Sequence, residues 1–282
     1  MKLIVDSGST NAQWVLLARN GDFTKVRTDG INPFYQTREG MKNTIQNQLL
    51  PQIAHLLWVG PIENVYFYGA GCTPEKIPFV AEALQMCFRK AEVSVENDAV
   101  GACRALLGDR EGIACILGTG SNSCHFDGEK IVKNVSPLGF ILGDEGSGAV
   151  LGKLLVADVL KNQLPKEVCD MFLNEYNTNK ADILENVYRR PFPNRYLASL
   201  SEFCARHIEV PELRALVYRN FDSFVKRNVA QYPQNLPIGF VGSIAYYYRE
   251  IFEEVLNANG LRLENILQSP IDGLTQYHKE KE

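Results

Sequence analysis

Three short runs rich in glycine, serine and threonine follow apolar segments, and each could bind phosphate. They are Asp6-Ser7-Gly8-Ser9-Thr10, Gly118-Thr119-Gly120-Ser121-Asn122 and Gly242-Ser243. A glycine lets the backbone approach a phosphate closely, and backbone N–H groups and hydroxyls then donate hydrogen bonds to its oxygens. One such run alone is usually only a tight turn, but three of them after buried strands favour a nucleotide site. The sequence has neither a GxxxxGK[ST] loop nor a GxGxxG motif that opens a helix directly after a strand.

Two aspartates stand where predicted strands end. Asp6 closes the first strand beside the first small-residue run, and a carboxylate there can hold Mg²⁺ for phosphoryl transfer or simply form a turn. Asp98 lies between a strand and a helix predicted to begin at residue 99. It fits two roles, an N-cap of that helix or a general base that accepts a hydroxyl proton. The two roles do not exclude each other.

A third acidic group lies in the segment LGFILGDEGSG at 138–148. Asp144 and Glu145 precede an apolar helical pattern, which is typical of a capped helix start. Four glycines crowd these acids, at positions 139, 143, 146 and 148. This crowding indicates close contact between the backbone and a ligand. Of the histidines, His125 and His207 are expected to be structural, and His55 and His278 to lie on the surface.

The elements that must position these residues alternate between strand and helix in the first half. Strands are predicted at 3–5, 13–18, 23–27, 65–68, 93–95, 113–117, 124–126, 130–135 and 238–241. Helices are predicted at 39–57, bent by Pro51, at 77–90, 99–107 and 246–257, with a mainly helical stretch at 147–230. Both halves carry strand, small-residue turn, strand and an Asn-Gly or Asp-Gly hairpin, which indicates an internal repeat. In the alignment of the repeats, Gly8 falls on Gly120 and Ser9 on Ser121.

Composition excludes several classes of protein. The 282 residues predict roughly two domains, and 45% hydrophobic with 22% charged residues excludes a disordered chain. A net charge of −4 gives no general attraction to nucleic acid or anionic membrane. No apolar run reaches the ~18 residues of a membrane span, and the N-terminus has no signal-peptide pattern, so we expect a cytoplasmic protein. The seven cysteines include no CxxC pair, so disulfides and zinc sites are not expected.

The ordered motifs DSGST, GINPF, GAG, ENDA, GTGSN, LGDEGSG and VGS resemble the N-acetylglucosamine kinase family. That family belongs to the actin-like, hexokinase-like and Hsp70-like ATPase superfamily and groups with the BadF/BadG/BcrA/BcrD-type ATPases. The resemblance implies an α/β fold of two actin-like ATPase (ribonuclease H-like) domains that face each other across a nucleotide and sugar cleft. It places the N-terminal domain at 1–108, with 269–282 returning to it, and the C-terminal domain at 109–268.

The resemblance also implies roles for individual residues. Asp98 matches the catalytic aspartate, which also contacts the sugar, and Asp6 is the metal candidate. Nucleotide contacts are implied for Ser7, Gly8, Ser9, Thr10, Thr119, Gly120, Gly242, Ser243 and Tyr246. Sugar contacts are implied for Asn32, Ser121, Asn122, Leu138, Gly139 and Asp144. Animal members have tryptophans where this chain has Phe34 and Leu138.

The resemblance implies an enzyme, an ATP-dependent phosphotransferase that uses Mg²⁺ and has an alcohol group as acceptor. The expected substrate is an amino sugar, N-acetylglucosamine or glucosamine, phosphorylated at the 6-hydroxyl. Two alternatives remain open: a BadF-type ATPase that drives the conformation of a partner protein, and a non-catalytic sugar or nucleotide sensor. The iron–sulfur cluster of BadF-type activators needs cysteines, and no close cysteine pair exists here. A homodimer is in keeping with the habit of the superfamily.

Overall fold

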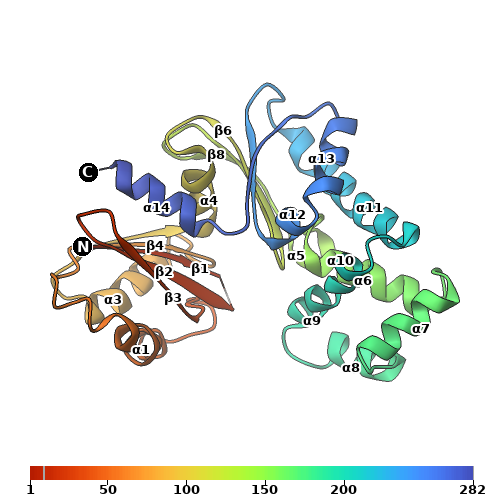
Figure 1. The fold of residues 1–282 in the computed structure, drawn as a ribbon, viewed down its shortest axis with the longest axis horizontal. Helices are drawn as coiled ribbons and strands as arrows, with labels where there is room; N and C mark the ends of the chain where they lie inside the picture. Colours follow the sequence, from red (N-terminus) through yellow and green to blue (C-terminus); the bar gives the residue numbers. More distant parts are fainter. Residues whose placement is uncertain (9, 282) are drawn as a thin grey trace. The chain divides into compact units, whose positions relative to one another are not determined.

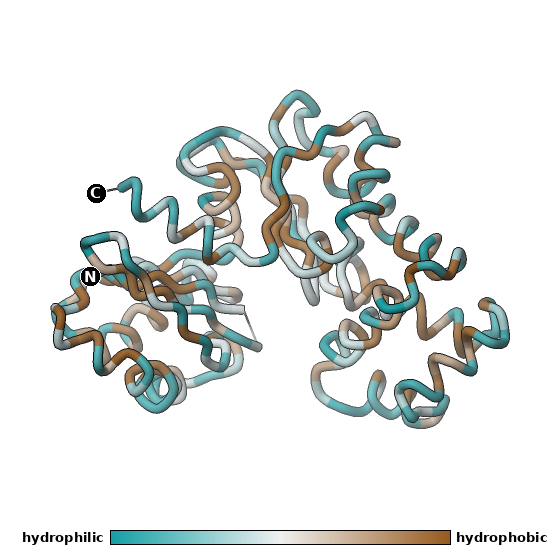
Figure 2. Tube along the Cα trace, in the orientation of Figure 1, coloured by the Kyte–Doolittle hydropathy of each residue, from teal (hydrophilic) through white to brown (hydrophobic). Residues whose placement is uncertain are grey.

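The computed structural model describes residues 1–8 and 10–281, and the chain divides into two compact units (Figure 1). Unit 1 comprises Met1–Arg110 and Ser269–Glu282, and unit 2 comprises Glu111–Gln268. Each unit contains one five-stranded sheet with helices packed against it. In Figure 2 the central strands of both sheets are hydrophobic, as expected for strands that helices cover.

The sheet of unit 1 has the order β3-β2-β1-β4-β5. Its strands are β1 (Lys2–Ser7), β2 (Asn11–Leu17), β3 (Phe23–Asp29), β4 (Asn64–Gly69) and β5 (Glu92–Asn97). β1 pairs antiparallel with β2 and parallel with β4, which in turn pairs parallel with β5. The central run Leu3-Ile4-Val5 is fully buried, so β1 is covered on both faces. The carboxyl ends of β1, β4 and β5 therefore lie at the same edge of the sheet.

Two sets of helices cover this sheet. One face packs with α1 (Arg38–Thr44), a π-helix (Ile45–Leu49), α2 (Leu50–Ile53) and α3 (Ile77–Cys87). The other face packs with α14 (Ile271–Glu280), which also contacts α4 (Asp98–Leu107). The C-terminal helix α14 thus belongs to the same unit as the first strand.

The helix predicted at 39–57 is shorter and less regular than expected, since α2 ends at Ile53. Pro51 in the first turn of α2 has no N–H group, and its ring would clash with the carbonyl four residues earlier in a regular helix. The chain widens into a π-turn at this point, where the N–H of Leu50 donates to the carbonyl of Ile45. The proline therefore changes the hydrogen-bond pattern before it.

Unit 2 repeats the topology of unit 1, with the order β10-β9-β6-β7-β8. Its strands are β6 (Gly112–Leu117), β7 (Ser121–Phe126), β8 (Ile131–Val135), β9 (Ile238–Val241) and β10 (Leu263–Leu267). β6 pairs antiparallel with β7 and parallel with β9, as β1 does with β2 and β4. The predicted internal repeat is confirmed. β10 was not predicted, because this edge strand exposes Glu264 and Asn265 and lacks an apolar run.

The structure corrects the alignment of the two repeats. β1 begins at Lys2 and β2 at Asn11, whereas β6 begins at Gly112 and β7 at Ser121. Gly8 therefore corresponds to Gly118, and the alignment of Gly8 with Gly120 is two residues wrong. In the corrected register the counterpart of Asp6 is Ile116. The repeat thus keeps the turn but carries this acid in unit 1 alone.

The predicted helical stretch at 147–230 is confirmed. The helices of unit 2 are α5 (Gly139–Leu142), α6 (Gly148–Leu160), α7 (Lys166–Glu175), α8 (Lys180–Tyr188), α9 (Pro193–Leu200), α10 (Glu202–Arg206), α11 (Pro211–Arg227), a 3₁₀ turn (Val229–Gln231), α12 (Ser243–Tyr247) and α13 (Arg249–Ala258). Across residues 1–8 and 10–281, none of the helices combines the length and apolar character that a membrane span requires.

A buried histidine joins α14 to the sheet of unit 1, so the expectation that His278 lies on the surface is wrong. Its ring stacks on Tyr66 with centroids 3.9 Å apart, and its Nε2 lies 3.0 Å from the hydroxyl of Tyr68. That hydroxyl accepts a hydrogen bond from Arg104 at 2.9 Å, so it can donate its proton to a neutral imidazole. Burial, followed by the charges of Arg104, Lys2 and Lys281, lowers the pKa of His278 to about 3.

This buried imidazole predicts acid sensitivity of the fold. Below the unfolded-state pKa of about 6.5 the unfolded chain binds a proton that the folded chain excludes, so stability falls as pH falls. From about pH 7.5 to about pH 5.5 the wild type should lose about 1.4 kcal/mol more of its free energy of unfolding than His278→Gln does. Urea unfolding at both pH values measures this difference. His55→Gln, which changes an exposed histidine, should behave like the wild type. An equal pH dependence in His278→Gln and the wild type would contradict this explanation.

Candidate active site

Two predicted site residues, Asp6 and Asp98, meet at the carboxyl edge of the first sheet. Asp6 is the second-last residue of β1 and lies opposite Tyr68 of β4. Asp98 directly follows β5 and is the first residue of α4. Asp6 and Ile4 lie two residues apart, so Asp6 points to the sheet face where Ile4 packs near α4 and α14. The sequence predicted both acids at strand ends, and the sheet order brings them together.

The N-cap of α4 is Asn97 rather than Asp98. The Asn97 side chain accepts a hydrogen bond from the N–H of Ala99 at 2.8 Å, and its backbone is extended as at a usual N-cap. The interpretation of Asp98 as the N-cap is therefore wrong by one residue. An acid in the first turn is still favoured by the helix dipole. With Asn97 as the cap, the Asp98 carboxylate is left for another role.

Both carboxyl groups have raised pKa values. Burial, and then the nearby Asp98 carboxylate, raise the pKa of Asp6 to about 7, while a hydrogen bond from the Ser269 hydroxyl at 3.4 Å lowers it. Burial also raises the pKa of Asp98, against backbone N–H groups that lower it. A base works best when its pKa lies near the operating pH, so these environments suit a carboxylate that accepts a proton.

The pair Asp6 and Asp98 also fits a divalent cation. Among the residues that the structure describes, no lysine or arginine is paired with either carboxylate. Within that same part of the chain, no cluster of three or more His, Cys, Asp or Glu residues could hold a metal ion. Mg²⁺ needs no such cluster, since one or two carboxylates with phosphate oxygens and water satisfy it. The donor set therefore fits Mg²⁺ bound together with a nucleotide.

The first small-residue turn contains both exposed and buried groups. Gly8 and Thr10 are exposed, and Ser9 lies outside the described residues. The Ser7 side chain is fully buried, and its hydroxyl accepts a hydrogen bond from Ile31 N–H at 2.8 Å and donates one to the Ile31 carbonyl at 3.0 Å. We therefore assign no phosphate contact to the Ser7 hydroxyl, although the sequence implied one.

The second turn lies against an acid in unit 2. The carboxylate of Asp144 accepts a hydrogen bond from the N–H of Ser121 at 3.2 Å. A Cβ atom on Gly120 would lie 3.2 Å from Asp144 Oδ2, so the glycine allows this close approach. Burial is the main cause that raises the pKa of Asp144. The structure thus brings together Gly120, Ser121 and Asp144, which the sequence placed in two separate motifs, and leaves the exposed Thr119 beside them.

The loop that carries Asp144 has two supports that the sequence analysis missed. Asn220 is buried in α11, where its Oδ1 accepts from Gly146 N–H at 3.0 Å and its Nδ2 donates to the Ser147 carbonyl at 3.2 Å. Glu145 forms an ion pair with Arg227 at 2.5 Å. A lone asparagine within the apolar pattern of α11 was a signal that could have indicated the first support.

Three other residues of unit 2 that were predicted to bind the nucleotide lie at the end of β9 and in α12. Gly242 has φ +127°, and a Cβ there would lie 2.2 Å from the carbonyl oxygen of Leu117, so this turn packs on the end of β6 and requires glycine. Ser243 opens α12, and Tyr246 is exposed and packs edge-on against Tyr247.

Three predicted sugar contacts lie elsewhere in unit 2. The amide oxygen of Asn122 accepts from Asn134 at 2.8 Å, so it is used within the sheet. Leu138 is exposed and has φ 59°, and Gly139 follows with φ 74°.

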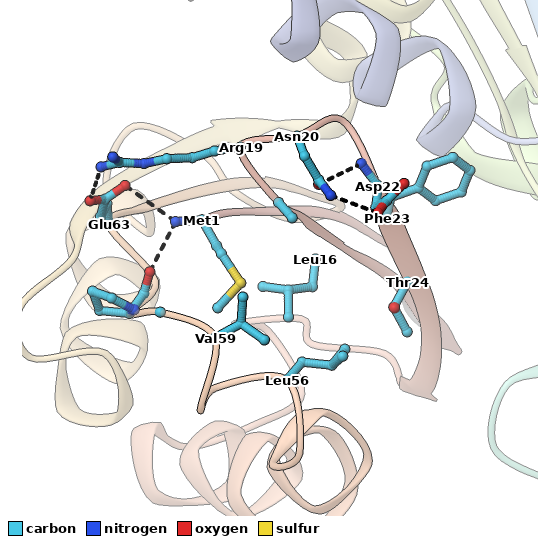
Figure 3. Close-up of a pocket in the computed structure, with 13 residues that line it drawn as sticks. Met1, Leu16, Arg19, Asn20, Asp22, Phe23, Thr24, Leu56, Val59 and Glu63 are labelled. Atoms are coloured by element: carbon cyan, nitrogen blue, oxygen red, sulfur yellow. Dashed lines mark hydrogen bonds and ion pairs between the residues drawn. The ribbon is translucent and has the colours of Figure 1, made fainter.

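A cavity of about 700 Å³ opens at the other end of the first sheet (Figure 3). Met1, Leu16, Leu56 and Val59 form its apolar lining. Its polar rim groups are paired with one another, Arg19 with Glu63 and Asn20 with Asp22. It contains none of the predicted site residues, so the carboxyl edge is the candidate active site.

Two repeated α/β units, each with a mixed five-stranded sheet in the same order, define the fold of the actin-like ATPases. The profile of the BadF/BadG/BcrA/BcrD ATPase family matches residues 5–162, and the chain belongs to this family. It is 50% identical to a candidate N-acetylglucosamine kinase of known structure from Porphyromonas gingivalis, over 99% of both chains with a TM-score of 0.95.

Two further relatives match less closely. A candidate N-acetylglucosamine kinase from Chromobacterium violaceum has a TM-score of 0.75 at 19% identity over 98% of both chains, which supports the fold alone. Glucosamine kinase GspK of Vibrio cholerae serotype O1 is 34% identical over 98 residues. That match spans 33% of this chain and 33% of the Vibrio enzyme.

Proposed function

We propose that this protein is an ATP-dependent amino-sugar kinase that phosphorylates N-acetylglucosamine or glucosamine at the 6-hydroxyl. The observation that carries the proposal is the pair of partly buried carboxylates, Asp6 and Asp98, at the carboxyl edge of the first sheet. The 50% identity to the candidate N-acetylglucosamine kinase over 99% of both chains supports the choice of sugar. The glucosamine kinase relative supports the same substrate class.

In this proposal Asp98 is the general base. Its carboxylate accepts the proton of the sugar hydroxyl as that oxygen attacks the γ-phosphorus of ATP, and ADP leaves. Asp6 is the residue that would hold Mg²⁺, and the metal ion when bound neutralises charge on the phosphate oxygens. Ser269 donates to Asp6 and so orients its carboxylate.

The other predicted residues are divided between nucleotide and sugar. We assign the nucleotide to Gly8, Ser9, Thr10, Thr119, Gly120, Gly242, Ser243 and Tyr246. We assign the sugar to Asn32, Ser121, Asn122, Leu138, Gly139 and Asp144, in addition to Asp98. Asp144 supports this assignment best, because its carboxylate lies against Ser121 and has a second oxygen for a sugar hydroxyl.

A panel of sugars tests the proposal. Purified protein with Mg-ATP should release ADP rapidly with N-acetylglucosamine or glucosamine and slowly without sugar. A hexose that lacks the amino group, such as glucose, is the matched control and should support less turnover. Equal ADP release with and without every sugar would favour an ATPase that drives a partner protein. Binding without any turnover would favour a sensor.

A substitution in the second turn tests the nucleotide assignment. Thr119→Val keeps the volume but removes the exposed hydroxyl, while the carbonyl that accepts from Ala149 N–H at 3.1 Å remains. Loss of one hydrogen bond to a charged phosphate should weaken the binding of ATP about tenfold. Sugar affinity should change much less. Measuring KM for ATP and for the sugar in the same assay checks this, and an equal change in both values would contradict the assignment.

A further inference from the structure

Ser7 connects the end of β1 to the segment that contains Asn32. Its buried hydroxyl bonds both the N–H and the carbonyl of Ile31, the residue before Asn32, at 2.8 and 3.0 Å. A hydroxyl with one proton and two lone pairs is well satisfied by this pair of bonds. The hydroxyl therefore satisfies both backbone groups of Ile31, as the backbone of a paired strand would, although Ile31 lies beyond the end of β3.

The backbone of Ser7 forms a second connection. Its carbonyl accepts a hydrogen bond at 2.8 Å from the N–H of Ala70, in the turn that follows β4. The same turn packs against Asn32, because a Cβ atom on Gly71 would lie 2.7 Å from Asn32 Oδ1. One residue at the end of β1 thus holds two backbone segments, and the Asn32 side chain is in contact with both.

The segment after Ile31 contains local hydrogen bonds, with Phe34 N–H donating to Asn32 Oδ1 at 2.9 Å and Tyr35 N–H donating to the Asn32 carbonyl at 3.1 Å. Phe34 and Tyr35 are 58% and 64% exposed, so they add little packing against the sheet. Gly30 N–H bonds the Thr10 carbonyl at 3.0 Å, and the Ser7 hydroxyl provides the next bond along the chain.

We propose that Ser7 is a positioning residue for the sugar, whose hydroxyl fixes the backbone at Ile31 and thereby the side chain of Asn32. This inference rests on the proposed assignment of Asn32 to the sugar. Ser7 lies in the turn assigned to the nucleotide, yet its side chain serves the neighbouring segment. Loss of the hydroxyl should therefore weaken the binding of the sugar and leave the binding of ATP unchanged.

Kinetics of Ser7→Ala and Ser7→Gly test this role. Removing a buried hydroxyl leaves the N–H and carbonyl of Ile31 without their partner, and KM for the preferred amino sugar should rise about 5- to 50-fold. KM for ATP should stay within about twofold. Thr275→Val is the matched control, because it removes another buried hydroxyl of unit 1, bonded at 2.7 Å within α14. It should change neither KM. An equal rise in both KM values for Ser7→Ala, or no rise in either, would overturn the inference.

Hydrogen exchange provides a test that needs no activity. In Ser7→Ala, amides in residues 30–36 should exchange at least about tenfold faster than in the wild type, because the anchor at Ile31 is lost. Thr275→Val should leave exchange in this segment unchanged. Unchanged exchange in Ser7→Ala overturns the positioning role even if the wild type is an active kinase. Conversely, a wild type without sugar-dependent turnover contradicts the proposed function, while the exchange result still decides whether the hydroxyl fixes this segment. Ser7→Gly repeats the test if Ser7→Ala does not fold.

Discussion

Asp98→Asn is expected to lower sugar-dependent turnover by about 10²- to 10⁴-fold, the usual contribution of general-base catalysis. The amide has nearly the shape of the carboxylate but cannot accept the proton of the sugar hydroxyl. Folding should be preserved, because the N-cap of α4 is Asn97 and remains in place. ATP affinity should persist, since the base acts on the acceptor. Turnover, KM for ATP and melting temperature together measure this prediction.

Glu96→Gln is the matched control for the general base. It makes the same acid-to-amide change two residues earlier, on an acid that pairs with Arg104 at 3.5 Å. It should retain turnover close to that of the wild type. If Asp98→Asn phosphorylated sugar at close to the parent rate, the catalytic assignment would be wrong, and Asp144 would become the next candidate for the base.

Asp6→Asn is expected to have opposite effects on activity and stability. Turnover should fall by about 10²-fold or more, because a neutral amide is a poorer ligand for Mg²⁺ than a carboxylate. The melting temperature should rise by a few degrees, about 1 kcal/mol or more of stability, because the variant removes a desolvated charge beside Asp98. Such opposite signs are typical of residues that are kept for function at a cost in stability.

Asp22→Asn provides the comparison for Asp6→Asn. Asp22 is an exposed acid near the other end of the same sheet, where it accepts from Asn20 at 2.7 Å. It should alter turnover and melting temperature little. A less stable Asp6→Asn protein with normal turnover would contradict both the proposed metal role and the repulsion between Asp6 and Asp98.

The sequence allowed the repeat and the acidic strand ends to be predicted, because both are local patterns. Apolar runs closed by small residues mark strand ends, and parallel strands bring their carboxyl ends to one edge. Asp6 and Asp98 were therefore identifiable before the structure. The exact partner of each acid was not, since Asn97 and Asp98 are adjacent and both types favour an N-cap.

Contacts between residues far apart in the sequence could not be predicted in the same way. Ser269 reaches Asp6 across 263 positions, and Asn220 reaches Gly146 across 74. No sequence pattern indicates that Ser269 contacts Asp6, and the lone Asn220 within α11 signals a buried polar role without indicating its partner Gly146. The burial of His278 is a similar case. Its neighbours in the sequence are polar and indicate an exposed position, but α14 packs its ring onto Tyr66. Tertiary packing, rather than local preference, determined these features.

The most direct test of the central claim is the ratio of sugar phosphate to ADP formed in one incubation with Mg-ATP and N-acetylglucosamine or glucosamine. A kinase that uses Asp98 as the base forms one molecule of sugar 6-phosphate for each ADP, and Asp98→Asn loses both products in parallel. ADP formed without sugar phosphate, or formed equally well by Asp98→Asn, would contradict the account.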